Sequence, residues 1–120
     1  MGVSPHANIF ALKVLGSDGS GSSSDIITAM DYVVTYSRQQ RGGNHRSVIS
    51  MSLGGPCDDD DCSSDSIVLA VENVIRQGIL VSVAAGNEGC NACYGSPNAA
   101  PNAITGTFVG PLSLSHAMNE

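Results

Sequence analysis

The chain has 120 residues, a net charge of −6 and 42% hydrophobic residues. This length allows one domain or part of one, and the hydrophobic content is high enough for a core, which excludes a disordered chain. The acidic balance excludes nucleic-acid binding through a basic patch. No apolar run approaches the roughly 18 residues of a membrane span, and no stretch has a signal-peptide pattern, so we expect neither in this chain.

The first half of the chain predicts a strand, a helix and a second strand. Residues 8–15 are a mostly apolar run that ends at Gly16, which is typical of a buried strand. Apolar residues at helical spacing predict a helix over residues 24–37, with its N-cap in the serine run 22–24 and Asp25 in the first turn. Residues 47–53 are the second predicted strand, which a Gly-Gly-Pro sequence stops.

A second helix and a third strand follow an acidic loop. Five apolar residues lie on one face of this helix: Ile67, Ala70, Val71, Val74 and Ile75. Ser64 or Asp65 is placed to cap its N-terminus, and Gly78 lies where a left-handed residue ends a helix. Residues 79–85 are the third predicted strand. This alternation predicts an α/β fold of right-handed βαβ units, with a parallel sheet covered by helices on both faces.

Glycine-rich or polar patches follow each predicted strand, at residues 16–21, 52–55 and 86–89. The carboxyl ends of parallel strands open onto the same edge of a sheet, where ligands bind. Each patch alone is compatible with an ordinary turn, but three on one edge favour a binding cleft. The patch 16–21 reads G-x-x-G-x-G, which is neither a dinucleotide fingerprint nor a P-loop, so a nucleotide-binding domain is a weak alternative.

The four cysteines form two close pairs, Cys57 with Cys62 and Cys90 with Cys93. Disulfides within or between the pairs would imply an oxidising compartment, whereas a four-thiolate zinc site would need a reducing one. Free thiols are the third interpretation, and the spacing alone leaves all three open.

Five segments together resemble the subtilisin-like serine proteases (peptidase S8): residues 2–7, 13–21, 50–55, 84–89 and 96–99. The resemblance covers residues 2–105 in order and spacing. It implies that residues 1–105 are part of an incomplete subtilisin-like domain, a three-layer α/β fold, and that residues 106–120 are a divergent tail.

The resemblance also implies a cleft for a polypeptide substrate in extended conformation. Its two edges and the wall of its side-chain pocket would be formed, in that order, by Gly19, Ser20 and Gly21, by Ser52, Leu53 and Gly54, and by Ala84, Ala85 and Gly86. Asn87 corresponds to the family's oxyanion-hole asparagine, which stabilises the negative charge that develops on the attacked carbonyl.

The segments that carry the family's Asp, His and Ser triad have no counterpart in this chain. His6, His45 and His116 lie in other contexts, so we expect no peptidase activity from this chain alone. Its function is then that of a fragment of a serine endopeptidase, or alternatively of a non-catalytic remnant that binds or inhibits through the same cleft.

Because subtilisin-like enzymes are mostly secreted, the resemblance implies a secreted parent protein and favours disulfides over zinc. Local bridges Cys57–Cys62 and Cys90–Cys93 would brace loops beside the cleft, although pairing between the loops stays open. No cofactor is required by the family's chemistry, but its members often bind calcium. The acidic run 58–61 offers oxygen ligands, yet the family's calcium positions do not map onto it, so a solvated loop is the favoured interpretation.

Overall fold

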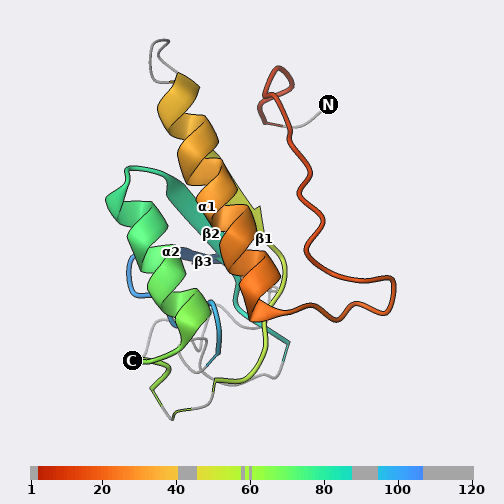
Figure 1. The fold of residues 1–120 in the computed structure, drawn as a ribbon, viewed down its shortest axis with the longest axis vertical. Helices are drawn as coiled ribbons and strands as arrows, with labels where there is room; N and C mark the ends of the chain where they lie inside the picture. Colours follow the sequence, from red (N-terminus) through yellow and green to blue (C-terminus); the bar gives the residue numbers. More distant parts are fainter. Residues whose placement is uncertain (1–2, 41–45, 58, 60, 88–94, 107–120) are drawn as a thin grey trace, which may run out of the picture.

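One parallel sheet with two helices forms the described part of the chain (Figure 1). The computed structural model describes residues 3–40, 46–57, 59, 61–87 and 95–106. In chain order, its elements are α1 (Ser23–Gln39), β1 (Val48–Met51), α2 (Ser66–Arg76), β2 (Leu80–Ala84) and β3 (Ile104–Gly106). The strand order is β1-β2-β3, with Val48 opposite Leu80 and Ser82 opposite Ile104. The predicted α/β fold with a parallel sheet is confirmed.

Both helices begin at side-chain caps that the sequence indicated. The Ser22 hydroxyl accepts a hydrogen bond from the Asp25 N–H at 3.2 Å, at the start of α1. At the start of α2, one Asp65 oxygen accepts from the N–H groups of Ile67 and Val68, both at 2.9 Å. Gly78 follows α2 with φ 84°, as predicted for a helix C-terminus. Within the described residues, neither helix is long and apolar enough to cross a membrane.

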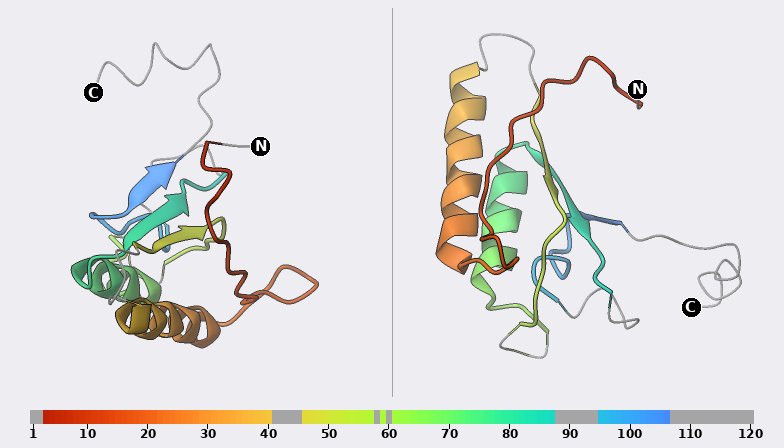
Figure 2. Two further views of the ribbon diagram at one scale, coloured as in Figure 1. Left: turned by 90° about the horizontal axis from the view of Figure 1, so that it is seen from above. Right: turned by 90° about the vertical axis from the view of Figure 1, so that its right-hand side faces the viewer.

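The two helices lie on the same face of the sheet (Figure 2). The expected covering of both faces is therefore not reached within the described residues. Among the described elements, α2 alone connects two strands, β1 and its parallel neighbour β2, so one right-handed connection places it on one face. The other helix, α1, precedes β1 and packs against α2 on that same face. The other face presents exposed apolar side chains from all three strands, namely Val48, Leu80 and Ile104.

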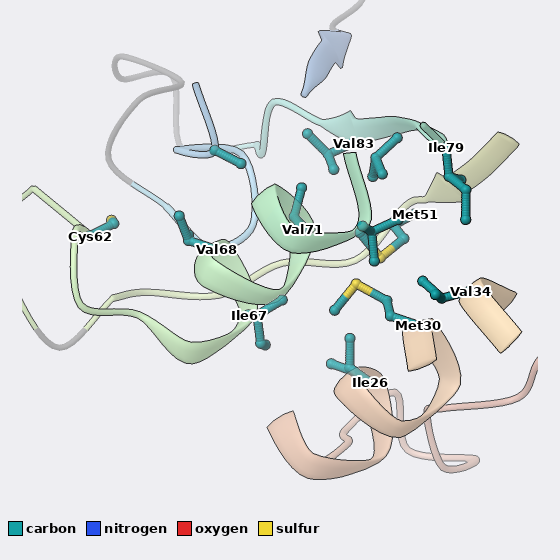
Figure 3. Close-up of a cluster of buried hydrophobic side chains, with 13 residues drawn as sticks. Ile26, Met30, Val34, Met51, Cys62, Ile67, Val68, Val71, Ile79 and Val83 are labelled. Atoms are coloured by element: carbon teal, nitrogen blue, oxygen red, sulfur yellow. The ribbon is translucent and has the colours of Figure 1, made fainter. Parts of the chain in front are cut away.

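The hydrophobic core lies between the helices and the sheet (Figure 3). Ile26, Met30 and Val34 project from α1 at helical spacing toward Met51 of β1 and toward α2. Val71 is fully buried in the middle of α2. Burial of the periodic apolar face of each helix explains why the 3.6-residue pattern located both helices correctly.

The predicted strand at residues 8–15 is wrong, because these residues form no ladder in the structure. Ile9 and Phe10 are 89% and 65% exposed. The Phe10 ring instead contacts the Tyr36 ring of α1, with centroids 5.1 Å apart. A strand exists only where a neighbouring strand pairs with its backbone. In this segment, apolar composition leads to packing along a helix instead.

Candidate functional site

A cavity of about 760 Å³ lies at the carboxyl ends of β1 and β2. The segments that follow these strands line it together with the segment that precedes α1. The structure brings to this cavity all ten residues that the resemblance assigned to the cleft and oxyanion hole: Gly19, Ser20, Gly21, Ser52, Leu53, Gly54, Ala84, Ala85, Gly86 and Asn87. The cavity thus contains residues from each of the three patches that the sequence singled out. The patch 16–21 follows no strand, and residues 88–89 of the third patch lie outside the described residues.

The segment before α1 forms one side of the cavity through a tight, hydrogen-bonded turn. The Gly16 N–H donates to the Ser20 carbonyl at 2.7 Å, and Gly19 has φ 81°, which favours glycine. A Cβ on Gly21 would lie 2.5 Å from the Val14 carbonyl oxygen, so no side chain fits there without movement. The Ser20 hydroxyl, and then its N–H, donate to Asp18 and lower the pKa of this exposed carboxyl.

The segment after β1 forms a second side and is held by main-chain hydrogen bonds to residue 96. Gly55 and Ser96 make an antiparallel bridge, with N–H to carbonyl distances of 2.9 and 3.0 Å. A Cβ on Gly54 would lie 3.0 Å from the Ser96 carbonyl oxygen, so the two segments approach as closely as glycine permits.

The segment after β2 forms the third side. Ala84 and Ala85 are half-buried, and their small side chains leave the adjoining space open. Gly86 has φ 90°, which turns the chain out of the strand direction. Asn87 follows as an exposed residue that lines the cavity.

Asp65 is the sole charged side chain among the described residues that line the cavity, and that lining includes no histidine. Its oxygen Oδ1 accepts a hydrogen bond at 2.7 Å from the Ser96 hydroxyl in addition to the two N–H groups of α2. The rest of the lining is uncharged and consists of glycine backbone, hydroxyls, amides and apolar side chains, both small and large. Such a surface suits a ligand recognised through its main chain.

Sequence reasoning gave no site role to several lining residues, among them Asp65, Gly95, Ser96 and Asn98. Asp65 was recognised as a helix cap, and residues 96–99 as part of the resemblance. The hydrogen bond between Ser96 and Asp65 spans 31 positions in the sequence. No local pattern signals such a pair, so only the tertiary structure identifies it.

A disulfide joins Cys57 and Cys62, with Cα atoms 5.3 Å apart. This bridge closes the loop between Pro56, which lines the cavity, and the start of α2. Of the interpretations that the cysteine spacing left open, the structure has the local bridge for this pair. Cys90 and Cys93 lie outside the described residues.

Two of the four aspartates of the acidic run, Asp59 and Asp61, belong to the described residues, and both accept hydrogen bonds from nearby serines. One oxygen of Asp59 accepts from the hydroxyl and N–H of Ser64, at 2.7 and 3.0 Å, and Asp61 accepts from the Ser63 N–H at 3.0 Å. The Ser64 hydroxyl, and then its N–H, lower the pKa of Asp59. The second oxygen of Asp59 has no hydrogen-bond partner. However, the described residues include no group of three His, Cys, Asp or Glu side chains that could hold a metal ion.

Comparison with known proteins identifies the family. The family model described as the subtilase family matches residues 1–109. The subtilisin-like serine protease Pen ch 13 of Penicillium rubens is 45% identical over 104 residues, which cover 87% of this chain and 24% of that protein. Rho m 2.0101 of Rhodotorula mucilaginosa, also a subtilisin-like serine protease, is 42% identical over 118 residues, which cover 97% of this chain and 32% of that protein.

A solved structure supports the same assignment at the level of the fold. The crystal structure of a cold adapted subtilisin-like serine proteinase matches with a TM-score of 0.61 and 33% identity, over 78% of this chain and 30% of that one. The chain thus spans about a quarter to a third of the length of these relatives. It belongs to the subtilase family.

Proposed function

We propose that the cavity is the substrate cleft of a subtilisin-like serine endopeptidase. The gathering of ten family-assigned residues, from three separate segments, around one cavity supports this proposal. A substrate chain would lie extended between Gly19–Gly21 and Ser52–Gly54 and add a strand by pairing with their backbone. The side chain before the cleaved bond would fill the space beside Ala84 and Ala85, whose small size suits a large apolar group.

Asn87 would supply an oxyanion-hole donor in this scheme. When a serine attacks the peptide carbonyl, negative charge develops on the carbonyl oxygen, and a fixed amide N–H lowers the energy of that state more than that of the substrate. The position of Asn87 on the cavity lining, directly after the turn at Gly86, supports this role.

The nucleophile and its base would come from triad segments outside this chain, because the described lining offers no histidine to activate a serine. The chain alone would then bind peptide without cleaving it. The parent protein would be secreted, which the Cys57–Cys62 disulfide supports, because such bonds persist in oxidising compartments. A non-catalytic remnant that retains the cleft is the alternative, and the missing triad is the observation that favours it.

Peptide binding by the chain as it stands tests the cleft. We expect a fluorescent six-residue peptide with a central phenylalanine to bind and to stay uncleaved. An Ala85→Phe variant would fill the pocket and weaken binding of this peptide about tenfold, while a peptide with alanine at that position keeps its affinity. Absence of binding, or equal losses for both peptides, would contradict the cleft assignment.

The coding sequence around this chain separates the enzyme from the remnant. Asp-Thr-Gly and His-Gly-Thr-His segments upstream and Gly-Thr-Ser-Met downstream would identify an active protease. In that protease, Asn87→Ala should lower kcat about 10²–10³-fold with little change in KM, a magnitude taken from the corresponding asparagine of subtilisin rather than from this cavity. A mature transcript that lacks all three segments would identify a peptide-binding protein.

A further inference from the structure

Ser96 uses all three of its polar groups to join parts of the cavity wall. Its N–H and carbonyl pair with Gly55, and its hydroxyl donates to Asp65 Oδ1 at 2.7 Å. The residue is only 4% exposed, so water does not compete for these bonds. Ser96 therefore connects the segment after β1 to the start of α2.

Asp65 is the fixed end of this connection. The same oxygen accepts from the N–H groups of Ile67 and Val68, which belong to the rigid first turn of α2. The positive end of the helix dipole stabilises the carboxylate there, and a charged acceptor makes the bond from Ser96 stronger than a bond between neutral groups. Asp65 thereby fixes the position of Ser96, and through Ser96 that of Gly55, relative to α2.

Gly55 directly follows the Ser52–Gly54 edge, with which the substrate backbone pairs in the proposed function. Neither Ser96 nor Asp65 belongs to the ten family-assigned residues, although both line the cavity. We propose that Asp65 and Ser96 are positioning residues, which set the separation between the Ser52–Gly54 edge and the rest of the cleft. This inference rests on the proposed function and goes beyond it by assigning the residues that hold the peptide-pairing edge in place.

The proposal predicts an effect on peptide affinity that is distinct from an effect on stability. Ser96→Ala removes the hydroxyl and leaves the main-chain pairing to Gly55 without its anchor, so peptide binding should weaken about tenfold. Asp65→Ser keeps an N-cap on α2, because serine caps helices well. Its shorter side chain no longer reaches Ser96, so it should weaken binding to the same degree. The double variant should bind no more weakly than either single variant, because all three lack the same link.

Two further variants serve as controls. Asp65→Asn retains an acceptor oxygen for Ser96 and should restore most of the affinity lost in Asp65→Ser. Ser37→Ala removes a buried serine hydroxyl whose partner, the Ser47 hydroxyl, lies 2.6 Å away, just before the start of β1, whereas the cavity lies beyond the end of that strand. It should lower the Tm as Ser96→Ala does but leave peptide affinity unchanged.

Fluorescence anisotropy with the same six-residue peptide gives the affinities, and thermal unfolding gives the Tm of each variant. Unchanged affinity in folded Ser96→Ala, or independent additive losses in the double variant, would overturn the proposal. If Ser96→Ala and Asp65→Ser both fail to fold, exchange of the Ser96 hydroxyl proton in the unmodified chain decides. Slow exchange supports the link, and exchange at the rate of free serine overturns it. Failure of the unmodified chain to bind peptide refutes the proposed cleft itself, and the positioning role with it.

Discussion

Two apolar runs of similar composition adopt different structures in this molecule. Residues 79–85 become β2, which pairs with β1 on one side and with β3 on the other. Residues 8–15 form no ladder, and their Ile9 is 89% exposed, whereas Val81 of β2 is 1% exposed. The difference shows that an apolar run becomes a strand through its backbone partners and its cover rather than through composition alone.

The contrast extends to the regions around these runs. We call residues 48–84 the sheet unit. It contains β1, α2 and β2, which pack against one another, and the Cys57–Cys62 disulfide. The N-terminal segment, residues 3–21, contacts the rest of the chain through the Phe10–Tyr36 ring pair and the partly buried Val14, and its hydrogen bonds around Asp18 lie within its own exposed turn. We therefore expect the sheet unit to unfold cooperatively and the N-terminal segment to open locally at lower cost.

The largest expected effect comes from placing a charge in each of the two runs. Val81→Asp buries an unpaired carboxylate between α2 and the sheet and should cost more than about 4 kcal/mol, a large share of the roughly 5–15 kcal/mol that stabilise an ordinary domain. Ile9→Asp places the same charge on an exposed position and should change the free energy of unfolding by less than about 0.5 kcal/mol. Urea unfolding followed by circular dichroism measures both.

Equal losses of unfolding free energy in the two variants would contradict the distinction between the two runs, because they would mean that residues 8–15 are packed in solution as firmly as β2. If neither variant lost stability, Val81 of β2 would not be part of the core in solution. Val48→Asp, on the exposed face of β1, serves as the matched strand control.

The same comparison explains which parts of the fold the sequence could predict. Both helices, the caps at Ser22 and Asp65 and the glycine after α2 follow from local patterns, and each has a local physical cause. Residues 8–15 were mispredicted because their pattern says nothing about partners. β3 gives no periodic signal, since its three residues are all exposed and it joins the sheet through its backbone pairing with β2.

The candidate site likewise has parts that local patterns predict and parts that depend on tertiary contacts. Its glycine-rich edges were predictable because they follow strands or match family segments. The link from Ser96 to Asp65 was not, because it depends on how two distant segments meet.

Removal of the disulfide should give the next largest effect. The bridge joins cysteines five positions apart, and loss of so short a loop closure corresponds to about 2 kcal/mol of stability in the chain-entropy model. We expect the double variant Cys57→Ala, Cys62→Ala to lose about this amount in urea unfolding. Cys57→Ala alone loses the bridge but keeps the buried Cys62 sulfur, so the difference between the two variants reports the packing of that side chain.

An unchanged midpoint in both disulfide variants would show that hydrogen bonds alone hold the loop before α2. In that case the loop of the sheet unit would be held in the same way as the exposed turn of the N-terminal segment, and the expected difference in stability between the two regions would be smaller.

A pair of glycines gives a smaller and more selective effect. Gly78, after α2, and Gly19, in the N-terminal segment, have φ of 84° and 81°. Alanine in this region is strained by about 1–2 kcal/mol. We expect Gly78→Ala to lower global stability by about that amount, because it ends a core helix. Gly19→Ala should leave the global unfolding midpoint unchanged and raise amide exchange only within residues 16–21.

Loss of global stability in Gly19→Ala would show that the N-terminal segment unfolds together with the sheet unit. Gly55→Ala is the matched control, because Gly55 has no positive φ and a Cβ there would meet nothing within 4 Å.

The smallest effect concerns two carboxyls with the same kind of partner, the exposed Asp18 and the partly buried Asp59. Hydrogen bonds from Ser64 and Ser20 lower the pKa values of Asp59 and Asp18, respectively, below the ordinary value of 3.8. A lowered pKa in the folded state means that the carboxylate form is favoured by folding. Its contribution to stability is therefore complete above the ordinary pKa and is lost as the pH falls through the folded-state value. We expect Ser64→Ala and Ser20→Ala each to raise the pKa of the partner aspartate, as measured by NMR titration of its carboxyl carbon.

The two regions should differ in what this rise does to stability. Asp59 belongs to the disulfide-closed loop of the sheet unit, so Ser64→Ala should make the unfolding midpoint fall less steeply with acidification below pH 3.8. Asp18 belongs to the N-terminal segment, so Ser20→Ala should shift its pKa without altering the pH dependence of global unfolding. If both variants alter that dependence, residues 16–21 fold as one unit with the sheet. If neither does, the acidic loop opens locally as the N-terminal segment does, and the boundary of the cooperative unit lies within residues 57–65.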